Sequence, residues 1–282
     1  MKFYKIKSHA KINLSLNVLG KFKSKLHKIE SLVSFLDLSD DIFIKNIESK
    51  NHKVKFKGKF SKKIPKKNTI TDLLKILEYK KKLKNQKYKI VVKKNIPQRA
   101  GLGGGSMNAA SLLNYFLKKK KINLNSRQII DVVKQIGSDV IVGMDKKNSI
   151  LYGNGRLKNI RKNINLYTVL VKPNFGCSTK AIYGNVRNYS KPIFKEGNKI
   201  NLDQKLLTNL KNDLEIPVFI KYPILKNTKI FMEKLDNVLF VRMTGSGSTL
   251  IGYFKSKKSA LNALKRLNKK YKNYWCILSK TI

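Results

Sequence analysis

The feature that most constrains this chain is a glycine-rich segment that runs directly into an apolar helical pattern. Four of the five residues from Gly101 to Gly105 are glycine, and the sequence after them predicts a helix over about 106–119. Glycine adopts positive φ angles easily and lets a backbone approach a ligand closely. The free N–H groups and the dipole at a helix N-terminus bind phosphate. The segment therefore predicts a phosphate-binding loop rather than a flexible connector.

Two common phosphate-binding motifs do not fit this segment. No Gly-Lys-Ser/Thr sequence closes it, so it is not a Walker A loop. Ser106 stands where a dinucleotide-binding fingerprint has its third glycine. If the loop binds phosphate, it therefore uses neither of these two motifs.

The net charge of +46 allows two interpretations. A basic surface attracts phosphate backbones, which suggests a nucleic-acid-binding protein. Specific nucleic-acid sites favour arginine, however, and 55 of the 62 basic residues here are lysine, spread over every segment. We favour a composition bias, and we expect no specific nucleic-acid partner. Hydrophobic residues, 41% of the chain, are distributed throughout, which excludes a disordered polycation.

Other classes of protein are also excluded. No apolar run approaches the ~18 residues that a membrane-spanning helix needs. Cys177 and Cys276 form no CxxC pair and the three histidines are scattered, so neither a zinc site nor a disulfide framework is expected. Lys11 and Asn13 interrupt the apolar core that a signal peptide would need. We expect a cytoplasmic protein with reduced thiols.

Apolar periodicity predicts a mixed order of strands and helices, typical of an α+β fold. Strands are expected at 12–18, 32–44, 88–93, 166–171, 239–243, 249–254 and 275–279, with an edge hairpin over 50–66. Helices are expected at 71–83 with Thr71 as N-cap, and at 106–119, 126–136, 178–187, 203–213, 227–236 and 257–269. The polar stretch 156–165 predicts a boundary between domains at 1–160 and 161–282.

The glycine-rich segment has the spacing of a known family. Pro97-x-x-x-Gly101-Leu102-Gly103-Gly104-Gly105-Ser106-x-Asn108-Ala109 resembles the ATP-binding motif of the GHMP kinases. Other segments resemble the branch of this family that phosphorylates the 2-hydroxyl of 4-diphosphocytidyl-2-C-methyl-D-erythritol. They are Ala10–Leu14, His27, Phe35–Asp40, Gly137–Val140, Asn212–Glu215 and Arg242–Gly247. These segments keep the family's order along nearly the whole chain.

This resemblance implies a two-domain α+β GHMP kinase fold whose ATP site lies at the glycine-rich loop and the helix N-terminus. It implies ATP as co-substrate, Mg²⁺ as cofactor, and a step in the non-mevalonate route to isoprenoid precursors. Two alternatives remain open at this stage. The chain could be a GHMP kinase for another small alcohol, such as homoserine or mevalonate, or a non-enzymatic nucleic-acid binder. The oligomeric state does not follow from the sequence.

The resemblance also assigns roles to individual residues. Asp139 is a carboxylate in an apolar stretch, which needs a partner. It matches the catalytic aspartate, and Lys11 matches the lysine that pairs with it. ATP binding falls to Asn68, Lys94, Pro97, Gly101, Leu102, Gly103, Gly104, Gly105 and Ser106. Substrate binding falls to Asn13, Leu26, His27, Thr179, Tyr183 and Gly245, and Ser106 is the candidate Mg²⁺ ligand.

Position 26 departs from the family pattern. The family has a tyrosine before the histidine that reads cytosine, and this chain has Leu26 before His27. One aromatic face for the cytosine is therefore expected to be missing. Tyr183 would supply the remaining aromatic face, although a helix residue packed on the core is an equally good interpretation of it.

Overall fold

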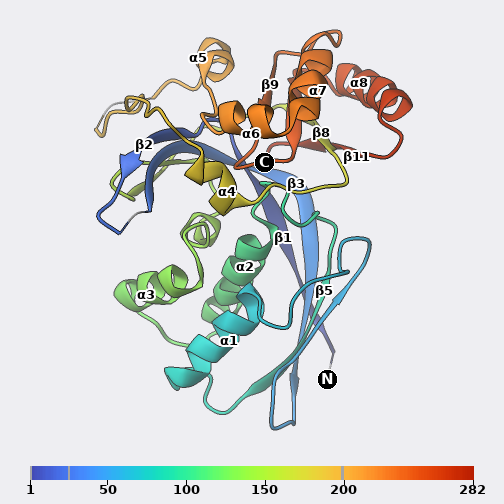
Figure 1. Cartoon of the computed structure of the whole chain (residues 1–282). Helices are drawn as coiled ribbons and strands as arrows, with labels where there is room; N and C mark the ends of the chain where they lie inside the picture. Colours follow the sequence, from blue (N-terminus) through green and yellow to red (C-terminus); the bar gives the residue numbers. More distant parts are fainter. Residues whose placement is uncertain (1, 25, 198–199) are drawn as a thin grey trace. The chain divides into compact units, whose positions relative to one another are not determined.

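The computed structural model describes residues 2–24, 26–197 and 200–282. The chain forms two compact units, and neither is continuous in sequence (Figure 1). Unit 1 comprises Met1–Lys11, Leu38–Gln98 and Gly103–Lys146, whereas unit 2 comprises Ile12–Asp37, Arg99–Leu102 and Lys147–Ile282. The glycine-rich segment therefore contributes to both units. The domain boundary expected at residue 160 stays a prediction.

Unit 1 is built from part of a sheet and the helices that cover it. Its elements are β1 (Tyr4–Asn13), the second half of β3 (His27–Ile47), β4 (Lys53–Lys57), α1 (Thr69–Tyr79), β5 (Lys87–Lys93), α2 (Gly104–Lys118), α3 (Ser126–Ile136) and the 3₁₀ helix η1 (Ile141–Met144). β3 pairs antiparallel with β5, with Phe43 opposite Val91. The α2 and α3 helices were both expected from the sequence, at nearly these bounds.

The prediction of an edge hairpin over residues 50–66 is wrong. Only β4 forms there, and it pairs in parallel with β5, with Val54 opposite Ile90. Parallel neighbours need a crossover connection, which α1 provides between β4 and β5. The alternation of Val54 and Phe56 identified a strand correctly, but its partner lies more than thirty residues away in sequence. Local periodicity carries no information about such a pairing.

The start of α1 also differs from the expectation. Asn68, not Thr71, is the N-cap: its Oδ1 accepts hydrogen bonds from the N–H groups of Ile70 and Thr71 at 3.1 and 3.2 Å. Thr71 Oγ1 accepts in turn from the Asn68 N–H at 2.9 Å. This reciprocal arrangement is a capping box, and it satisfies helix N–H groups that would otherwise lack partners.

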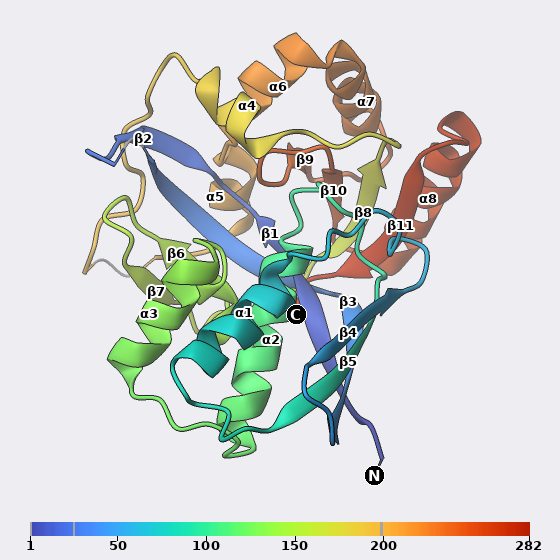
Figure 2. The ribbon, with the colours of Figure 1, turned by 60° about the horizontal axis from the view of Figure 1, so that its bottom comes forward.

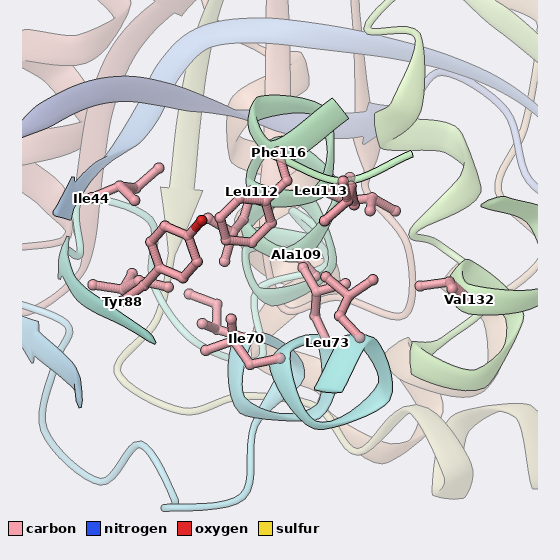
Figure 3. Close-up of a cluster of buried hydrophobic side chains, with 14 of the residues drawn as sticks. Ile44, Ile70, Leu73, Tyr88, Ala109, Leu112, Leu113, Phe116 and Val132 are labelled. Atoms are coloured by element: carbon pink, nitrogen blue, oxygen red, sulfur yellow. The ribbon is translucent and has the colours of Figure 1, made fainter. Parts of the chain in front are cut away.

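The core of unit 1 fixes the position of α2. Figure 2 shows α1 and α2 side by side, and Figure 3 shows their side chains interleaved against the sheet. The residues drawn there include Ile44 and Tyr88 from the strands, Ile70 and Leu73 from α1, Ala109, Leu112, Leu113 and Phe116 from α2, and Val132 from α3. Each fully buried large apolar side chain contributes about 1.5–3 kcal/mol. Because α2 is anchored along its length, its N-terminal turn is held in place within unit 1.

Unit 2 contains a second sheet and most of the remaining helices. Its elements are the first half of β3, β2 (Asn17–Lys21), β6 (Ser149–Leu151), β7 (Leu157–Asn159), β8 (Tyr167–Lys172), α4 (Thr179–Gly184), α5 (Gln204–Asn209), α6 (Glu215–Lys221), α7 (Pro223–Glu233), β9 (Phe240–Met243), β10 (Leu250–Phe254), α8 (Lys257–Lys270) and β11 (Trp275–Lys280). Four of the strands form an antiparallel sheet in the order β11-β8-β10-β9, and α8 packs against it (Figure 1). Both units mix helices and strands, as expected.

The helices before β9 are shorter and more numerous than expected. The helix predicted at 203–213 ends at Asn209, and α6 was not predicted at all. The helix predicted from 227 begins instead at Pro223, which occupies its first turn. Proline is favoured there because the first-turn N–H has no helical partner to lose. In the parts of the chain that the structure describes, no helix is both long and apolar enough to cross a membrane.

Candidate active site

Lys11 and Asp139 form an ion pair in unit 1. Lys11 Nζ lies 3.1 Å from Asp139 Oδ2, and the side chains are 7% and 41% exposed. Lys11 lies on β1, whereas Asp139 lies in the turn between α3 and η1. Gly137 ends α3 just before that turn, as expected. The buried lysine and the half-exposed carboxylate are the two groups that the family resemblance singled out, and the fold brings them together.

The glycine-rich segment passes directly over the Lys11 side chain. Gly103 has a φ of +65°, and a Cβ at this position would lie 2.7 Å from Lys11 Cγ. Any other residue would therefore be strained in its backbone and would push against the lysine stem. Glycine at this position lets the loop and Lys11 approach each other closely.

The N-terminus of α2 has no side-chain cap. Gly103 is its N-cap residue and supplies no side-chain hydrogen bond. The first-turn N–H groups of Gly104, Gly105 and Ser106 receive no bond from the N-cap side chain and can bind a ligand, and the helix dipole favours an anion there. Thr69 Oγ1 donates to the carbonyl of Gly105 at 2.7 Å, which ties this turn to α1. Pro97 and Leu102, which flank the loop entry, are both buried.

Gly101 has a packing role in unit 2. Its φ is +72°, and a Cβ on it would lie 2.0 Å from the Thr244 carbonyl oxygen. Thr244 Oγ1 donates to the Gly101 carbonyl at 3.1 Å and accepts from the Asn13 N–H at 3.0 Å. Gly245, at a φ of +54°, packs on Gly101 as well. The structure thus joins Asn13, Gly101 and Gly245, which the sequence analysis had divided between substrate and ATP.

The turn that carries Gly245 is held by groups that sequence reasoning missed. Asn212 Nδ2 donates to the carbonyls of Met243 and Gly245 at 2.8 and 2.9 Å. Ser246 Oγ lies 2.9 Å from Thr179 Oγ1, the predicted substrate residue at the start of α4. Asn212 and Ser246 both lie in segments that resemble the family, and that resemblance was the available signal.

Asn68 and Lys94, which the resemblance assigns to ATP binding, have structural partners in unit 1. The Asn68 side chain accepts two N–H bonds as N-cap and donates to the carbonyls of Pro65 and Lys66 at 3.0 and 3.1 Å. Its amide oxygen is therefore used by the cap and its amide nitrogen by the preceding loop. The Lys94 ammonium is buried and forms an ion pair with Asp40, a carboxylate to which the sequence analysis gave no role.

His27 and Tyr183 meet in unit 2. Their ring centroids are 5.0 Å apart with an interplanar angle of 40°. Within the described part of the chain, the buried His27 Nε2 has no hydrogen-bond partner. Burial, and secondarily the charge of Lys21, lowers the pKa of His27, which keeps the imidazole neutral at pH 7. Tyr183 is half-buried and packs against the unit 2 core, as one of its two interpretations expects, and its role as an aromatic face for a base stays a prediction. Leu26 is 69% exposed.

Comparison with known proteins tests the family resemblance. The GHMP kinase N-terminal domain matches residues 68–150, and the GHMP kinase C-terminal domain matches residues 192–273. The 4-diphosphocytidyl-2-C-methyl-D-erythritol kinase of Pelagibacter ubique is 52% identical over all of both chains. The enzyme of the same name from Caldicellulosiruptor bescii is 32% identical over 93% of each chain.

A solved structure supports the fold independently of close sequence identity. The crystal structure of a 4-(cytidine 5'-diphospho)-2C-methyl-D-erythritol kinase covers 98% of this chain and 99% of its own at a TM-score of 0.77, with 23% identity. This match confirms the expected two-domain α+β fold. Together with the full-length identity to the Pelagibacter enzyme, it shows that the chain belongs to the GHMP kinases, in the family of 4-diphosphocytidyl-2-C-methyl-D-erythritol kinases.

Proposed function

We propose that Asp139 and Lys11 carry the phosphoryl transfer in this kinase. The reaction is the ATP-dependent phosphorylation of the 2-hydroxyl of 4-diphosphocytidyl-2-C-methyl-D-erythritol. The observation that carries the assignment is the 3.1 Å ion pair between these two side chains, directly beside the glycine-rich loop. A kinase needs a group that orients the attacking hydroxyl and a cation near the transferred phosphoryl group. Asp139 would orient the hydroxyl, and Lys11 would supply the cation.

Asp139 is the candidate acceptor for the proton of the substrate hydroxyl. Its carboxylate is half-exposed, so a substrate hydroxyl can reach it. As the hydroxyl oxygen attacks the γ-phosphorus, its proton passes to an Asp139 oxygen and the bond to the β–γ bridging oxygen breaks. The Lys11 ammonium, 3.1 Å away, attracts the carboxylate and holds it in place for this transfer.

Lys11 is the candidate for electrostatic stabilisation. Its stem is buried beneath Gly103, so the ammonium is held in one place rather than sampling solvent. A fixed positive charge in a poorly hydrated position stabilises the negative charge that develops on the phosphoryl oxygens. No reorganisation is then needed at the moment of reaction.

The N-terminus of α2 is the candidate cradle for the ATP phosphates, through the N–H groups of Gly104, Gly105 and Ser106. GHMP kinases use ATP as co-substrate, and we propose Mg²⁺ as well. In the described residues no three His, Cys, Asp or Glu side chains gather to hold a metal. Mg²⁺ is bound mainly by nucleotide phosphates and water, with few protein ligands. The Ser106 hydroxyl would be one ligand, and the ion would neutralise phosphate charge.

The cytidine end of the substrate is assigned to unit 2. His27 Nε2 is buried and has no partner among the described residues, so it can bond to the edge of a base. Tyr183 offers an aromatic face beside it. Thr179, through its contact with Ser246, and Asn13, through its contact with Thr244, belong to the same unit and complete the proposed substrate side.

Neither alternative function is favoured. Homoserine and mevalonate have no base that could contact the His27 and Tyr183 rings. The net charge of +46 is the only argument for a nucleic-acid binder, and net charge alone does not specify nucleic-acid binding. We propose a cytoplasmic enzyme in isoprenoid precursor synthesis. A coupled ATPase assay with 4-diphosphocytidyl-2-C-methyl-D-erythritol, homoserine and mevalonate tests the function. We expect kcat/KM for the first to exceed the others by at least about a hundredfold. Equal rates would refute it.

A further inference from the structure

Unit 1 contains one carboxylate that is completely buried. Asp40 is 0% exposed and accepts hydrogen bonds from four different groups. The N–H groups of Asn95 and Ile96 donate to its Oδ1 at 2.8 and 2.9 Å, and Asn108 Nδ2 donates to its Oδ2 at 3.1 Å. The Lys94 ammonium completes the set as an ion pair with Oδ2. The mechanism proposed above uses none of these contacts.

The partners of Asp40 lie at the two ends of the phosphate loop. Lys94 and Asn95 follow β5 and lead into the glycine-rich segment, whereas Asn108 belongs to the second turn of α2. One carboxylate therefore links the strand before the loop to the helix after it. Burying a charge is costly unless it is paired and fully hydrogen-bonded, and here both conditions are met.

The Lys94 ammonium lies against the first residue of α2. A Cβ on Gly104 would lie 3.3 Å from Lys94 Nζ, and the other atoms nearest to it belong to Ile96. The ammonium thus comes closer to the helix N-terminus than the carboxylate that neutralises it. It lies beside N–H groups that are themselves polarised to attract an anion.

We propose that the buried Asp40–Lys94 pair lies beneath the phosphate cradle and sets the charge sensed by the nucleotide phosphates. The inference rests on the proposed binding of ATP at the α2 N-terminus. When phosphate is bound, Lys94 attracts it from Gly104's side, while Asp40 offsets part of that attraction.

This arrangement predicts effects of opposite sign for its two members. Lys94→Met leaves a buried negative charge near the phosphates, so nucleotide binding weakens. Asp40→Asn keeps the acceptor for the N–H groups of Asn95 and Ile96 but leaves the ammonium unopposed, so binding strengthens. A purely structural pair would behave differently, because loss of either partner would distort the loop and weaken binding in both variants.

The experiment is isothermal titration calorimetry of the full chain with a non-hydrolysable ATP analogue, ADP and adenosine. We expect the Kd for the ATP analogue to rise at least about tenfold in Lys94→Met and to fall several-fold in Asp40→Asn, as a unit charge a few ångströms away requires. Both effects should shrink with ADP and vanish with adenosine, which has no phosphate.

The next residues along each strand supply a matched control. Asp41 and Lys93 stand opposite each other in the β3–β5 register, one residue away from Asp40 and Lys94. Asp41→Asn and Lys93→Met change the same charges at neighbouring positions and should leave all three Kd values within about twofold, because successive residues of a strand point to opposite faces of the sheet and Asp41 is paired with Lys5.

Several outcomes overturn the proposal. Weaker binding of the ATP analogue in both variants would show a structural pair, and an equal change with adenosine would place Lys94 at the base instead. Should Asp40→Asn fail to fold, the double variant Asp40→Asn/Lys94→Met removes both charges, and its Kd must lie between those of wild type and Lys94→Met. A wild-type chain that binds no ATP analogue would refute the proposed function instead.

Discussion

The Lys11 ammonium lies 3.1 Å from the Asp139 carboxylate although the two residues are 128 positions apart in sequence. β1 presents the lysine, and the turn after α3 presents the aspartate. An ion pair with one partner 41% exposed contributes little to stability, since solvent screens it. Its arrangement is better explained by chemistry, because it holds a fixed cation and a reachable base together beside the phosphate loop.

The first prediction concerns that pair. Asp139→Asn should lower kcat by about 10²–10⁴-fold, because an amide cannot take the proton of the substrate hydroxyl. Affinity for ATP should change little, since the proposed cradle consists of backbone N–H groups. Steady-state kinetics and calorimetry of the same preparation measure both quantities. Asp131→Asn, at an exposed position on α3, is the control and should keep wild-type kcat. An Asp139→Asn enzyme with more than about a tenth of wild-type kcat would remove Asp139 from the mechanism.

The second prediction separates packing from phosphate binding among the loop glycines. Gly101→Ala should destabilise the fold by roughly 2 kcal/mol or more, because a residue with a side chain is strained at its φ of +72° and its Cβ would lie 2.0 Å from the Thr244 oxygen. Thermal unfolding should show a Tm lower by about 5 °C or more.

Gly184→Ala is the control for that measurement. A Cβ at Gly184 would meet no atom within 4 Å, and its φ is not in the left-handed region. Its Tm should equal that of wild type or exceed it slightly, since alanine is the better helix former. A Gly101→Ala variant as stable as Gly184→Ala would contradict the close approach of Gly101 to Thr244.

Gly101 shows which features of the loop could be predicted from the sequence and which could not. A glycine run before an apolar helix is a local signal, so both the loop and α2 could be predicted. Gly101 was assigned to ATP along with its neighbours, yet its conformation is required by Thr244, which lies 143 residues away. Composition of a loop indicates that the backbone must approach something closely, but it does not indicate what. The identity of the neighbour depends on non-local packing.

The same limit explains the other differences. The strand at 53–57 was visible in its alternation, whereas its parallel partner β5 was not. Asp40 resembled a family residue by position, but nothing local revealed that four donors converge on it. The pairing of Lys11 with Asp139 came from resemblance, since one lysine among 55 has no local distinction. Periodicity predicted elements, and contacts between distant segments had to come from the fold.

The third prediction uses the lowered pKa of His27, caused mainly by burial and then by Lys21. The folded protein favours the neutral imidazole, so His27 contributes stability above the ordinary pKa of 6.5 and loses it as the pH falls through the lowered value. Its Nε2 should likewise read cytosine only while neutral. We expect the ratio of kcat/KM for wild type to that for His27→Gln to be constant from pH 8 to 7 and to decline below 6.5. A ratio that does not change with pH would show that His27 plays no part in substrate binding.

The last prediction concerns Tyr183 and the exposed Leu26. If Tyr183 stacks on the cytosine, Tyr183→Ala should raise KM for the cytidine substrate by the roughly 1–3 kcal/mol that base stacking contributes, or about 5- to 150-fold. KM for ATP should stay unchanged, and Tyr183→Phe should keep the substrate KM because it keeps the ring. Tyr183 also packs on the unit 2 core, so the Tm of each variant is needed as well.

Leu26→Tyr tests the same site in the opposite direction. Leu26 is 69% exposed, so a larger side chain fits there without displacing core residues. A second aromatic face should lower KM for the cytidine substrate, while kcat changes little because this binding is equal in the ground and transition states. Suppose instead that Tyr183→Ala lowers Tm but leaves the substrate KM at its wild-type value. Tyr183 is then a core residue only, and the base must be recognised by other side chains of unit 2.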